Sequence, residues 1–265
     1  MEKRGSYEKI TALITCLVMT LFYTISYHYP LNGKQTTYSI AEEYPNLFTP
    51  PAYTNLICII LMLLMVGYSL FQFGLILKNS GKLSDERNQQ MRLCFSISNL
   101  LVIIWILAWS FDFMALALVI VTILVIALSI INKTLSQENL SKSEKVFVRL
   151  PFSIGYGYML MWLIINTITL LKSIRWNFLG ISEEIWMIGV LAFVLCIVSY
   201  RTQKNKDIAY CLTVLWVYIG ILMKHILKSE LDGQYAEVII ALIIYILILL
   251  GNAGYLMISN RKREL

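Results

Sequence analysis

The chain has 265 residues, of which 58% are hydrophobic and only 14% carry a charge. Soluble domains are usually about half apolar and about one quarter charged. A chain with so few charged residues cannot cover a surface that faces water. The composition therefore excludes a soluble enzyme, a disordered chain, a collagen-like chain and a secreted disulfide scaffold, and it indicates an integral membrane protein with several spans.

Long apolar stretches predict the individual spans. A helix rises about 1.5 Å per residue, so about 20 apolar residues cross the hydrocarbon core of a bilayer. Eight stretches meet this requirement: residues 10–28, 53–77, 91–110, 113–132, 150–171, 185–200, 207–226 and 236–257. The third and fourth stretches are nearly continuous, and residues 93–131 contain no Gly or Pro. Because this run is long enough to cross the membrane twice, it must turn, and we expect a tight turn where Ser110 and Asp112 interrupt it. The expected fold class is an all-α integral membrane bundle of about eight transmembrane helices.

The basic residues are distributed unevenly over the two sides of this bundle. With connections assigned alternately, 17 of the 22 Lys and Arg residues fall on the side of the N-terminus and 5 on the other. Positive residues remain on the cytoplasmic side during insertion, so both termini are expected to be cytoplasmic. The net charge of +6 thus reflects topology, and nucleic-acid binding is not expected. No cleavage pattern follows the first span, which we interpret as a retained anchor.

No constellation of catalytic residues can be assembled from the sequence. Ionisable residues are missing from the middle of the spans, and the usual protease, hydrolase and phosphate-binding motifs are absent. We therefore predict no enzyme activity, no catalytic or metal-binding residues and no cofactor. His28 and His225 are interpreted as interfacial side chains, with haem ligation as the alternative. Ser182, Glu183 and Glu184 are interpreted as a helix start, with a ligand-binding role for the two acids as the alternative.

The tryptophans favour the outer half of the predicted bundle. Trp105 and Trp109 are four residues apart and share one helix face, as do Trp162 and Asn166, with Tyr158 four residues earlier. Two interpretations remain open. One is internal packing together with an outer aromatic belt. The other is an aromatic cavity between helices that opens outward, with Asn166 as a polar contact for a flat apolar ligand.

Three motifs in order resemble a known family. The first outer loop ends in PNLFTPPAY (residues 45–53), the third span ends in WILAW (105–109), and the fifth opens with RLPF (149–152). Together they resemble the translocator protein family, called tryptophan-rich sensory proteins in bacteria. The resemblance covers roughly residues 1–172, and the whole chain is similar to a longer bacterial branch with three further helices.

The resemblance implies a domain organisation and a set of site residues. Residues 1–172 would form a five-helix bundle whose ligand pocket is capped by the first loop, and residues 173–265 a three-helix membrane extension. The family binds porphyrins, and sterol-like molecules in animals. The positions that match its ligand site, including Phe48 and Tyr53 where the family has Trp, are Phe48, Pro50, Pro51, Tyr53, Trp105, Trp109, Tyr158, Trp162 and Asn166. Because Trp is replaced at pocket positions, the shape of the pocket can persist while the ligand changes.

The function expected from the residues and the resemblance is that of a membrane receptor or carrier. It would bind a planar hydrophobic ligand, tetrapyrrole-like or lipid-like, in the outward-opening aromatic cavity. The alternative is a small transporter or channel-like subunit that uses the last three helices. Expected partners are membrane lipid and a porphyrin or other hydrophobic small molecule, and a homodimer is compatible with the sequence. The expected location is the bacterial plasma membrane.

Overall fold

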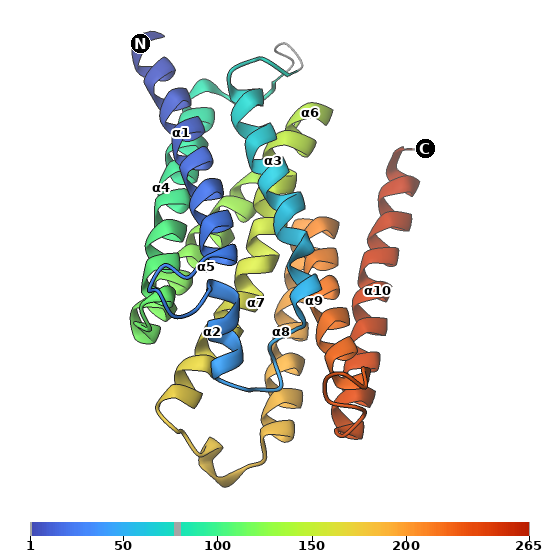
Figure 1. Cartoon of the computed structure of the whole chain (residues 1–265). Helices are drawn as coiled ribbons and strands as arrows, with labels where there is room; N and C mark the ends of the chain where they lie inside the picture. Colours follow the sequence, from blue (N-terminus) through green and yellow to red (C-terminus); the bar gives the residue numbers. More distant parts are fainter. Residues whose placement is uncertain (1, 77–80, 265) are drawn as a thin grey trace.

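The computed structural model describes residues 2–76 and 81–264 as a bundle of long helices (Figure 1). Within these two ranges, eight helices are long and apolar enough to cross a membrane, which confirms the predicted fold class. The elements in chain order are α1 (Glu2–His28), α2 (Thr37–Glu43), η1 (Ala52–Asn55), α3 (Leu56–Gln72), α4 (Asp85–Ser110), α5 (Met114–Gln137), α6 (Lys142–Glu144), η2 (Lys145–Arg149), α7 (Leu150–Ser173), η3 (Phe178–Gly180), α8 (Glu183–Asn205), α9 (Ile208–Ile226) and α10 (Ala236–Glu264).

Several helices extend beyond the predicted apolar stretches into polar sequence. α4 begins at Asp85 rather than residue 91, because the Ser84 hydroxyl accepts a hydrogen bond from the amide of Arg87 and caps the first turn. α6, η2 and α7 likewise form one continuous helical segment from residue 142, so the fifth span begins before the predicted residue 150. The predicted end of the second span at residue 77 lies outside the described residues, and α3 ends at Gln72.

The turn between α4 and α5 lies where the sequence predicts it. Asp112 adopts a left-handed backbone conformation (φ 64°), which Asp tolerates better than most residues. Its amide donates to the carbonyl of Trp109, and the amide of Phe113 donates to that of Ala108. The carboxylate of Asp112 accepts a hydrogen bond from the Tyr44 hydroxyl at 3.1 Å. Burial and then this carboxylate raise the pKa of Tyr44, so the phenol keeps the proton that it donates.

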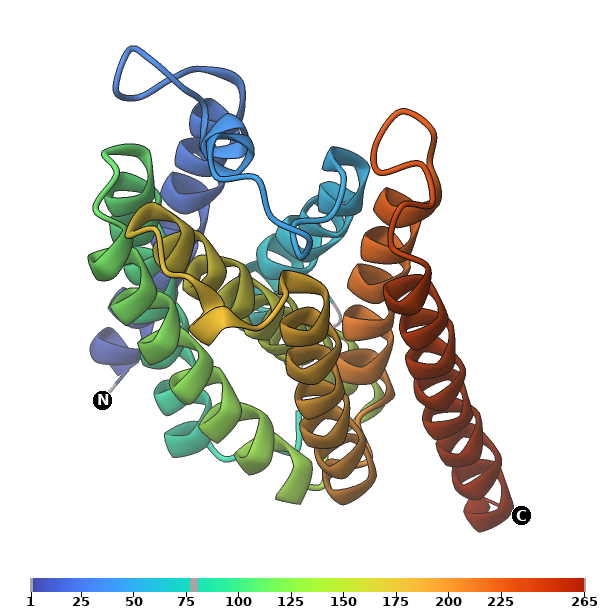
Figure 2. The ribbon, with the colours of Figure 1, turned by 90° about the horizontal axis from the view of Figure 1, so that it is seen from below.

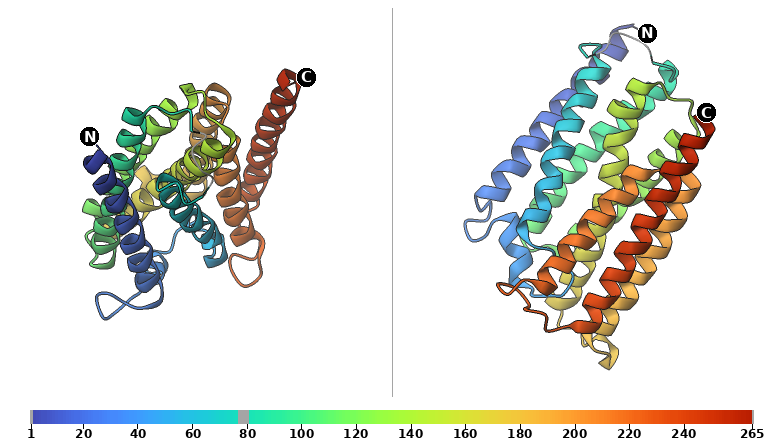
Figure 3. Two further views of the ribbon diagram at one scale, coloured as in Figure 1. Left: turned by 90° about the horizontal axis from the view of Figure 1, so that it is seen from above. Right: turned by 90° about the vertical axis from the view of Figure 1, so that its right-hand side faces the viewer.

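α7 lies in the interior of the bundle and contacts α3, α5 and α9. α1 packs against α3 and α4 on one flank of the bundle. α10 forms the opposite flank, and in the described residues it makes its main helix contacts with α8 and α9 (Figure 3). Both termini lie toward the same end of the bundle (Figure 1). We call the other end, which carries α2 and η3, the distal end.

A buried polar network joins α5, α7, α8 and α9 near the end that holds the termini. One carboxylate oxygen of Asp207 accepts hydrogen bonds from Asn132 Nδ2 and Ser153 Oγ, both at 2.6 Å. Its other oxygen accepts from the amide of Tyr210 and caps α9, and Asn205 Nδ2 donates to the side-chain oxygen of Asn132. These contacts connect the two regions predicted as residues 1–172 and 173–265, and that division stays a prediction.

Close contact between α7 and α9 depends on Gly157. A Cβ atom at this position would lie 2.9 Å from Thr213 Cβ and 3.0 Å from the carbonyl oxygen of Tyr210. We expect Gly157→Ala to lower the free energy of unfolding by about 1–3 kcal/mol, because α9 would have to move away from α7. Chemical denaturation in mixed micelles measures this change. Gly189→Ala is the matched control, since a Cβ there meets no atom within 4 Å, and a loss of stability as large in this variant would contradict the explanation.

Candidate functional site

Three of the predicted tryptophans meet between α4 and α7. The rings of Trp105 and Trp109 stack at a centroid distance of 5.9 Å. The Trp162 ring contacts both edge-on, at 5.3 Å from Trp105 and 6.0 Å from Trp109. Tyr158 extends this cluster at 6.1 Å from Trp162. The helical spacings that predicted shared faces therefore bring these side chains together across two helices.

The indole N–H groups of Trp105 and Trp109 make hydrogen bonds within the protein. Trp105 Nε1 donates to Asn166 Oδ1 at 3.1 Å, and Asn166 Nδ2 donates to the carbonyl of Trp162 at 2.8 Å. Trp109 Nε1 donates to the carbonyl of Thr37 in α2 at 3.0 Å. Trp105, Trp109 and Asn166 are buried. This part of the cluster is closely packed, and Asn166 orients an indole ring in this structure.

A small pocket lies beside the cluster at Trp162. It is lined on one side by Tyr158, Met161, Trp162 and Ile165 of α7 with Val217 of α9, and on the other by Thr49, Pro50, Thr54 and Asn55. Its volume is about 20 Å³, which is room for about one water molecule. Pockets for small organic ligands usually have about 300–1,000 Å³. In this conformation the pocket is therefore closed to a ligand.

A larger groove of about 450 Å³ lies between α1 and the η1–α3 segment. Aromatic rings and short polar side chains line it: Tyr23, Thr24, Tyr27, His28, Ala52, Tyr53, Asn55, Leu56, Cys58, Ile59 and Met62. The groove reaches the size of a ligand site, and its walls combine apolar surface with hydroxyl groups. Such walls suit a flat apolar molecule that carries a few polar groups.

The groove and the small pocket share one wall. Asn55 lines both, and its side-chain oxygen accepts a hydrogen bond from the Tyr158 hydroxyl at 3.1 Å. Tyr23 in the groove donates to Cys58 Sγ at 3.4 Å, and Cys58 packs with Tyr158. The two spaces are thus neighbours that share Asn55 as a lining residue.

The remaining predicted residues lie on the connection from α2 to α3. Phe48 and Pro51 are buried, Pro50 lines the small pocket, and the exposed ring of Tyr53 lines the groove. Seven of the nine predicted residues thus lie in the tryptophan cluster, the small pocket or the groove, whereas Phe48 and Pro51 line neither space. The roles of all nine toward a ligand stay predictions.

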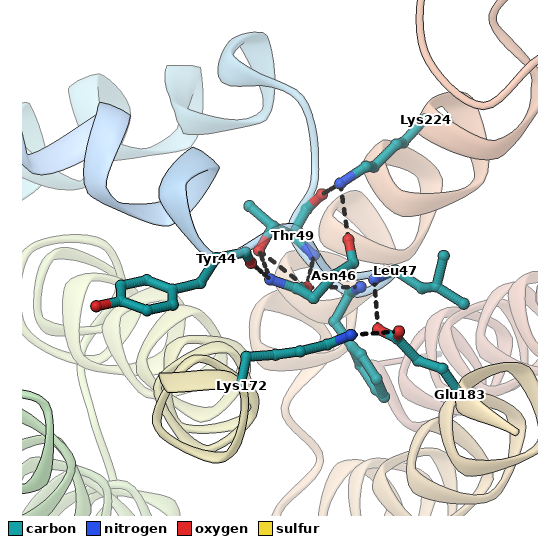
Figure 4. Close-up of polar contacts among 8 residues, drawn as sticks. Tyr44, Asn46, Leu47, Thr49, Lys172, Glu183 and Lys224 are labelled. Atoms are coloured by element: carbon teal, nitrogen blue, oxygen red, sulfur yellow. Dashed lines mark hydrogen bonds and ion pairs between the residues drawn. The ribbon is translucent and has the colours of Figure 1, made fainter. Parts of the chain in front are cut away.

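Residues of α8, α9 and the end of α7 hold this connection, and sequence reasoning did not predict these contacts. The carbonyls of Asn46 and Thr49 accept hydrogen bonds from Lys224 Nζ at 3.0 and 2.9 Å (Figure 4). The amide of Leu47 donates to Glu183 Oε1 at 3.1 Å, and the other oxygen of Glu183 pairs with Lys172 Nζ at 2.6 Å (Figure 4).

Two further contacts continue this series. His225 Nε2 donates to the carbonyl of Leu47 at 3.2 Å, and Trp216 Nε1 donates to the carbonyl of Thr54 at 2.8 Å. His225 lies in the last turn of α9 and is fully buried, so its ring contacts the protein and is not exposed at the surface, and its interpretation as an interfacial side chain stays a prediction. We call Glu183, Trp216, Lys224 and His225 the clamp residues, and residues 46–54 the covering segment.

The interpretation of residues 182–184 as a helix start is correct in position but not in every contact. α8 begins at Glu183, yet the Ser182 side chain makes no capping hydrogen bond to the backbone. Glu183 instead binds the covering segment. The sequence shows two acids and a lysine at predicted outer helix ends, which is a sign of polar contacts there. Nothing in the neighbouring sequence indicates their partners, because Leu47 lies 136 residues from Glu183 and Asn46 lies 178 residues from Lys224.

The geometry defines a class of protein. Eight apolar helices form a multi-pass membrane bundle with a tryptophan cluster between α4 and α7, and the residues that the structure describes hold no group of three His, Cys, Asp or Glu side chains arranged for a metal ion. The family model described as TSPO-like protein matches residues 9–255. The chain therefore belongs to the translocator protein (TSPO)-like family, and the match reaches into its eighth span. No curated protein and no solved structure gives a significant match.

Proposed function

We propose that this protein is a membrane receptor or carrier for a planar hydrophobic ligand, tetrapyrrole-like or lipid-like, that binds at the distal aromatic site. The observation that carries the proposal is the groove of about 450 Å³ between α1 and α3, which is lined by three tyrosines and a histidine. Its volume lies in the range of small-molecule sites. Family membership supports the same class of function.

The position of the groove favours a ligand that arrives from the bilayer. Ile59 and Leu56 line the groove and are more than half exposed, on a helix long and apolar enough to cross a membrane. A ligand could thus enter sideways from the hydrocarbon phase while its polar groups meet Tyr27 and His28 near the helix end. We further propose a bacterial plasma membrane location with both termini cytoplasmic, in agreement with the uneven distribution of Lys and Arg.

Removing one aromatic wall of the groove should weaken binding. We expect Tyr53→Ala to raise the dissociation constant for a flat probe about fivefold, because one aromatic contact contributes about 1 kcal/mol. The measurement is quenching of tryptophan fluorescence when purified protein is titrated with protoporphyrin IX, and in parallel with dehydroergosterol, a fluorescent sterol.

Two variants complete this experiment. Tyr255→Ala removes an exposed tyrosine from α10, away from the groove, and should leave affinity unchanged. Ile59→Trp fills the groove with a larger side chain and should reduce binding more than Tyr53→Ala does. Linear, unsaturable quenching by both probes in the unsubstituted protein would refute the proposal, and equal affinities in the Tyr53→Ala and Tyr255→Ala variants would refute this location.

A further inference from the structure

The clamp residues hold the covering segment through its main chain. The clamp residues contact the carbonyls of Asn46, Leu47, Thr49 and Thr54 and the amide of Leu47. Main-chain atoms are the same in every residue, so these contacts fix where the segment lies and do not select its side chains. The bonds from Lys224 and to Glu183 involve charged groups, which makes them stronger than neutral hydrogen bonds.

The same segment forms one wall of the closed pocket. Thr49, Pro50 and Thr54 face Trp162 and its neighbours on α7 across a space of about 20 Å³. Lys224 holds the carbonyl of Thr49, and Trp216 holds that of Thr54. Val217, the neighbour of Trp216 in α9, also lines the pocket. The clamp residues therefore act on the wall whose position sets the volume of this space.

Close packing at Gly220 reinforces the hold. A Cβ atom at Gly220 would collide with Thr54 Oγ1, so Thr54 rests directly on the backbone of α9. Seen from the distal end, the connection between α2 and α3 crosses the end of the bundle (Figure 2). Movement of the segment away from α7 must break the contact at Thr54 together with the clamp bonds.

We propose that the clamp residues are positioning residues that hold the covering segment closed over the pocket at Trp162, so that α8 and α9 control access to it. A ligand needs several hundred Å³, so the pocket can admit one only when the segment moves. The helices that follow α7 thereby regulate the distal site of the first five spans. The ligand part of this inference rests on the proposed function, whereas the closure itself does not.

The test measures access to the pocket without any ligand. Met161 lines the pocket and is buried, and Met161→Cys places a thiol there. Its reaction rate with N-ethylmaleimide is followed by mass spectrometry of the peptide, in the full-length protein. In the same sample, the native Cys211, fully buried in α9, reports on the bundle as a whole.

We expect Lys224→Met, added to this protein, to raise the labelling rate at position 161 about tenfold, because two charge-assisted hydrogen bonds are lost. Glu183→Ala should act in the same direction, and Lys224→Arg, which keeps donors and charge, should stay near the parent rate. Lys228→Met is the matched control, since it removes an exposed lysine four residues away. Labelling of Cys211 should not change in any of these variants.

The labelling rates decide whether the clamp residues close the pocket. Equal rates at position 161 in Lys224→Met, Glu183→Ala and Lys228→Met would overturn the proposal. A parallel rise at Cys211 would also overturn it, because the clamp residues would then stabilise the whole bundle without a specific effect on the pocket. If labelling responds as expected while neither protoporphyrin IX nor dehydroergosterol binds, the closure stands and the proposed ligand class is refuted.

Discussion

Trp109→Ala should lower the free energy of unfolding by about 3–5 kcal/mol, the usual effect of removing a buried tryptophan side chain. The indole is fully buried, stacks on Trp105 and contacts Trp162 edge-on. Its removal leaves a cavity between α4 and α7 and deprives the carbonyl of Thr37 of its donor. Chemical denaturation in mixed micelles, followed by circular dichroism, measures the change.

Two variants separate the contributions to this effect. Trp109→Phe keeps an aromatic ring but loses the hydrogen bond to Thr37, so the loss should be smaller, about 1–3 kcal/mol. Phe113→Ala removes an exposed ring from the neighbouring turn and should change stability by less than about 0.5 kcal/mol. If Trp109→Ala unfolds like the unsubstituted protein but no longer binds the flat probes, packing is not its role, and the sequence-based interpretation as a ligand-stacking side chain is supported.

The second large effect is expected from Asp207→Ala, at about 3–5 kcal/mol. The buried carboxylate accepts from Asn132, Ser153 and the amide of Tyr210. Alanine leaves all three donors without this acceptor and removes the cap of α9. The same denaturation experiment applies, and thermal unfolding should show a lowered midpoint.

The controls for Asp207 test the hydrogen bonds rather than the charge alone. Asp207→Asn has a similar shape, but one of the two accepting oxygens becomes an NH₂ group. This donor then faces other donors, which are Asn132 and Ser153 in one orientation of the side chain and the amide of Tyr210 in the other. We therefore expect an intermediate loss, about 1–3 kcal/mol. Glu237→Ala removes an exposed acid from the first turn of α10. A loss in Asp207→Ala no larger than in Glu237→Ala would contradict the structural role of the network.

The spans were predictable because each depends on local composition. Any stretch of about 20 apolar residues gains by leaving water, and within a bilayer the helix satisfies its own backbone. A turn was required by length, since residues 93–131 are too long for one span, and the polar interruption at Ser110 and Asp112 gave its position. The errors lie at the helix ends, where capped polar turns such as the one at Ser84 extend the helices beyond the apolar sequence.

The aromatic cluster was predictable in part. Spacings of four residues placed Trp105 with Trp109, and Tyr158 with Trp162, on common faces, and the structure brings those faces together. Sequence periodicity does not reveal how tightly two faces pack. The structure shows a buried cluster with a space of about 20 Å³ beside Trp162, and the larger groove on the other side of Asn55.

The sequence alone determined that this is a multi-pass helical membrane protein, where its helices lie, and which family it resembles, because these features depend on neighbouring residues and short motifs. Tertiary structure decided that His225 is buried, that Lys224 and Glu183 hold the connection between α2 and α3, and that Gly157 and Gly220 allow close contact with other elements. These contacts join residues far apart in the chain. They arise only when the helices pack, since packing alone fixes which main-chain atoms come within reach of a given side chain.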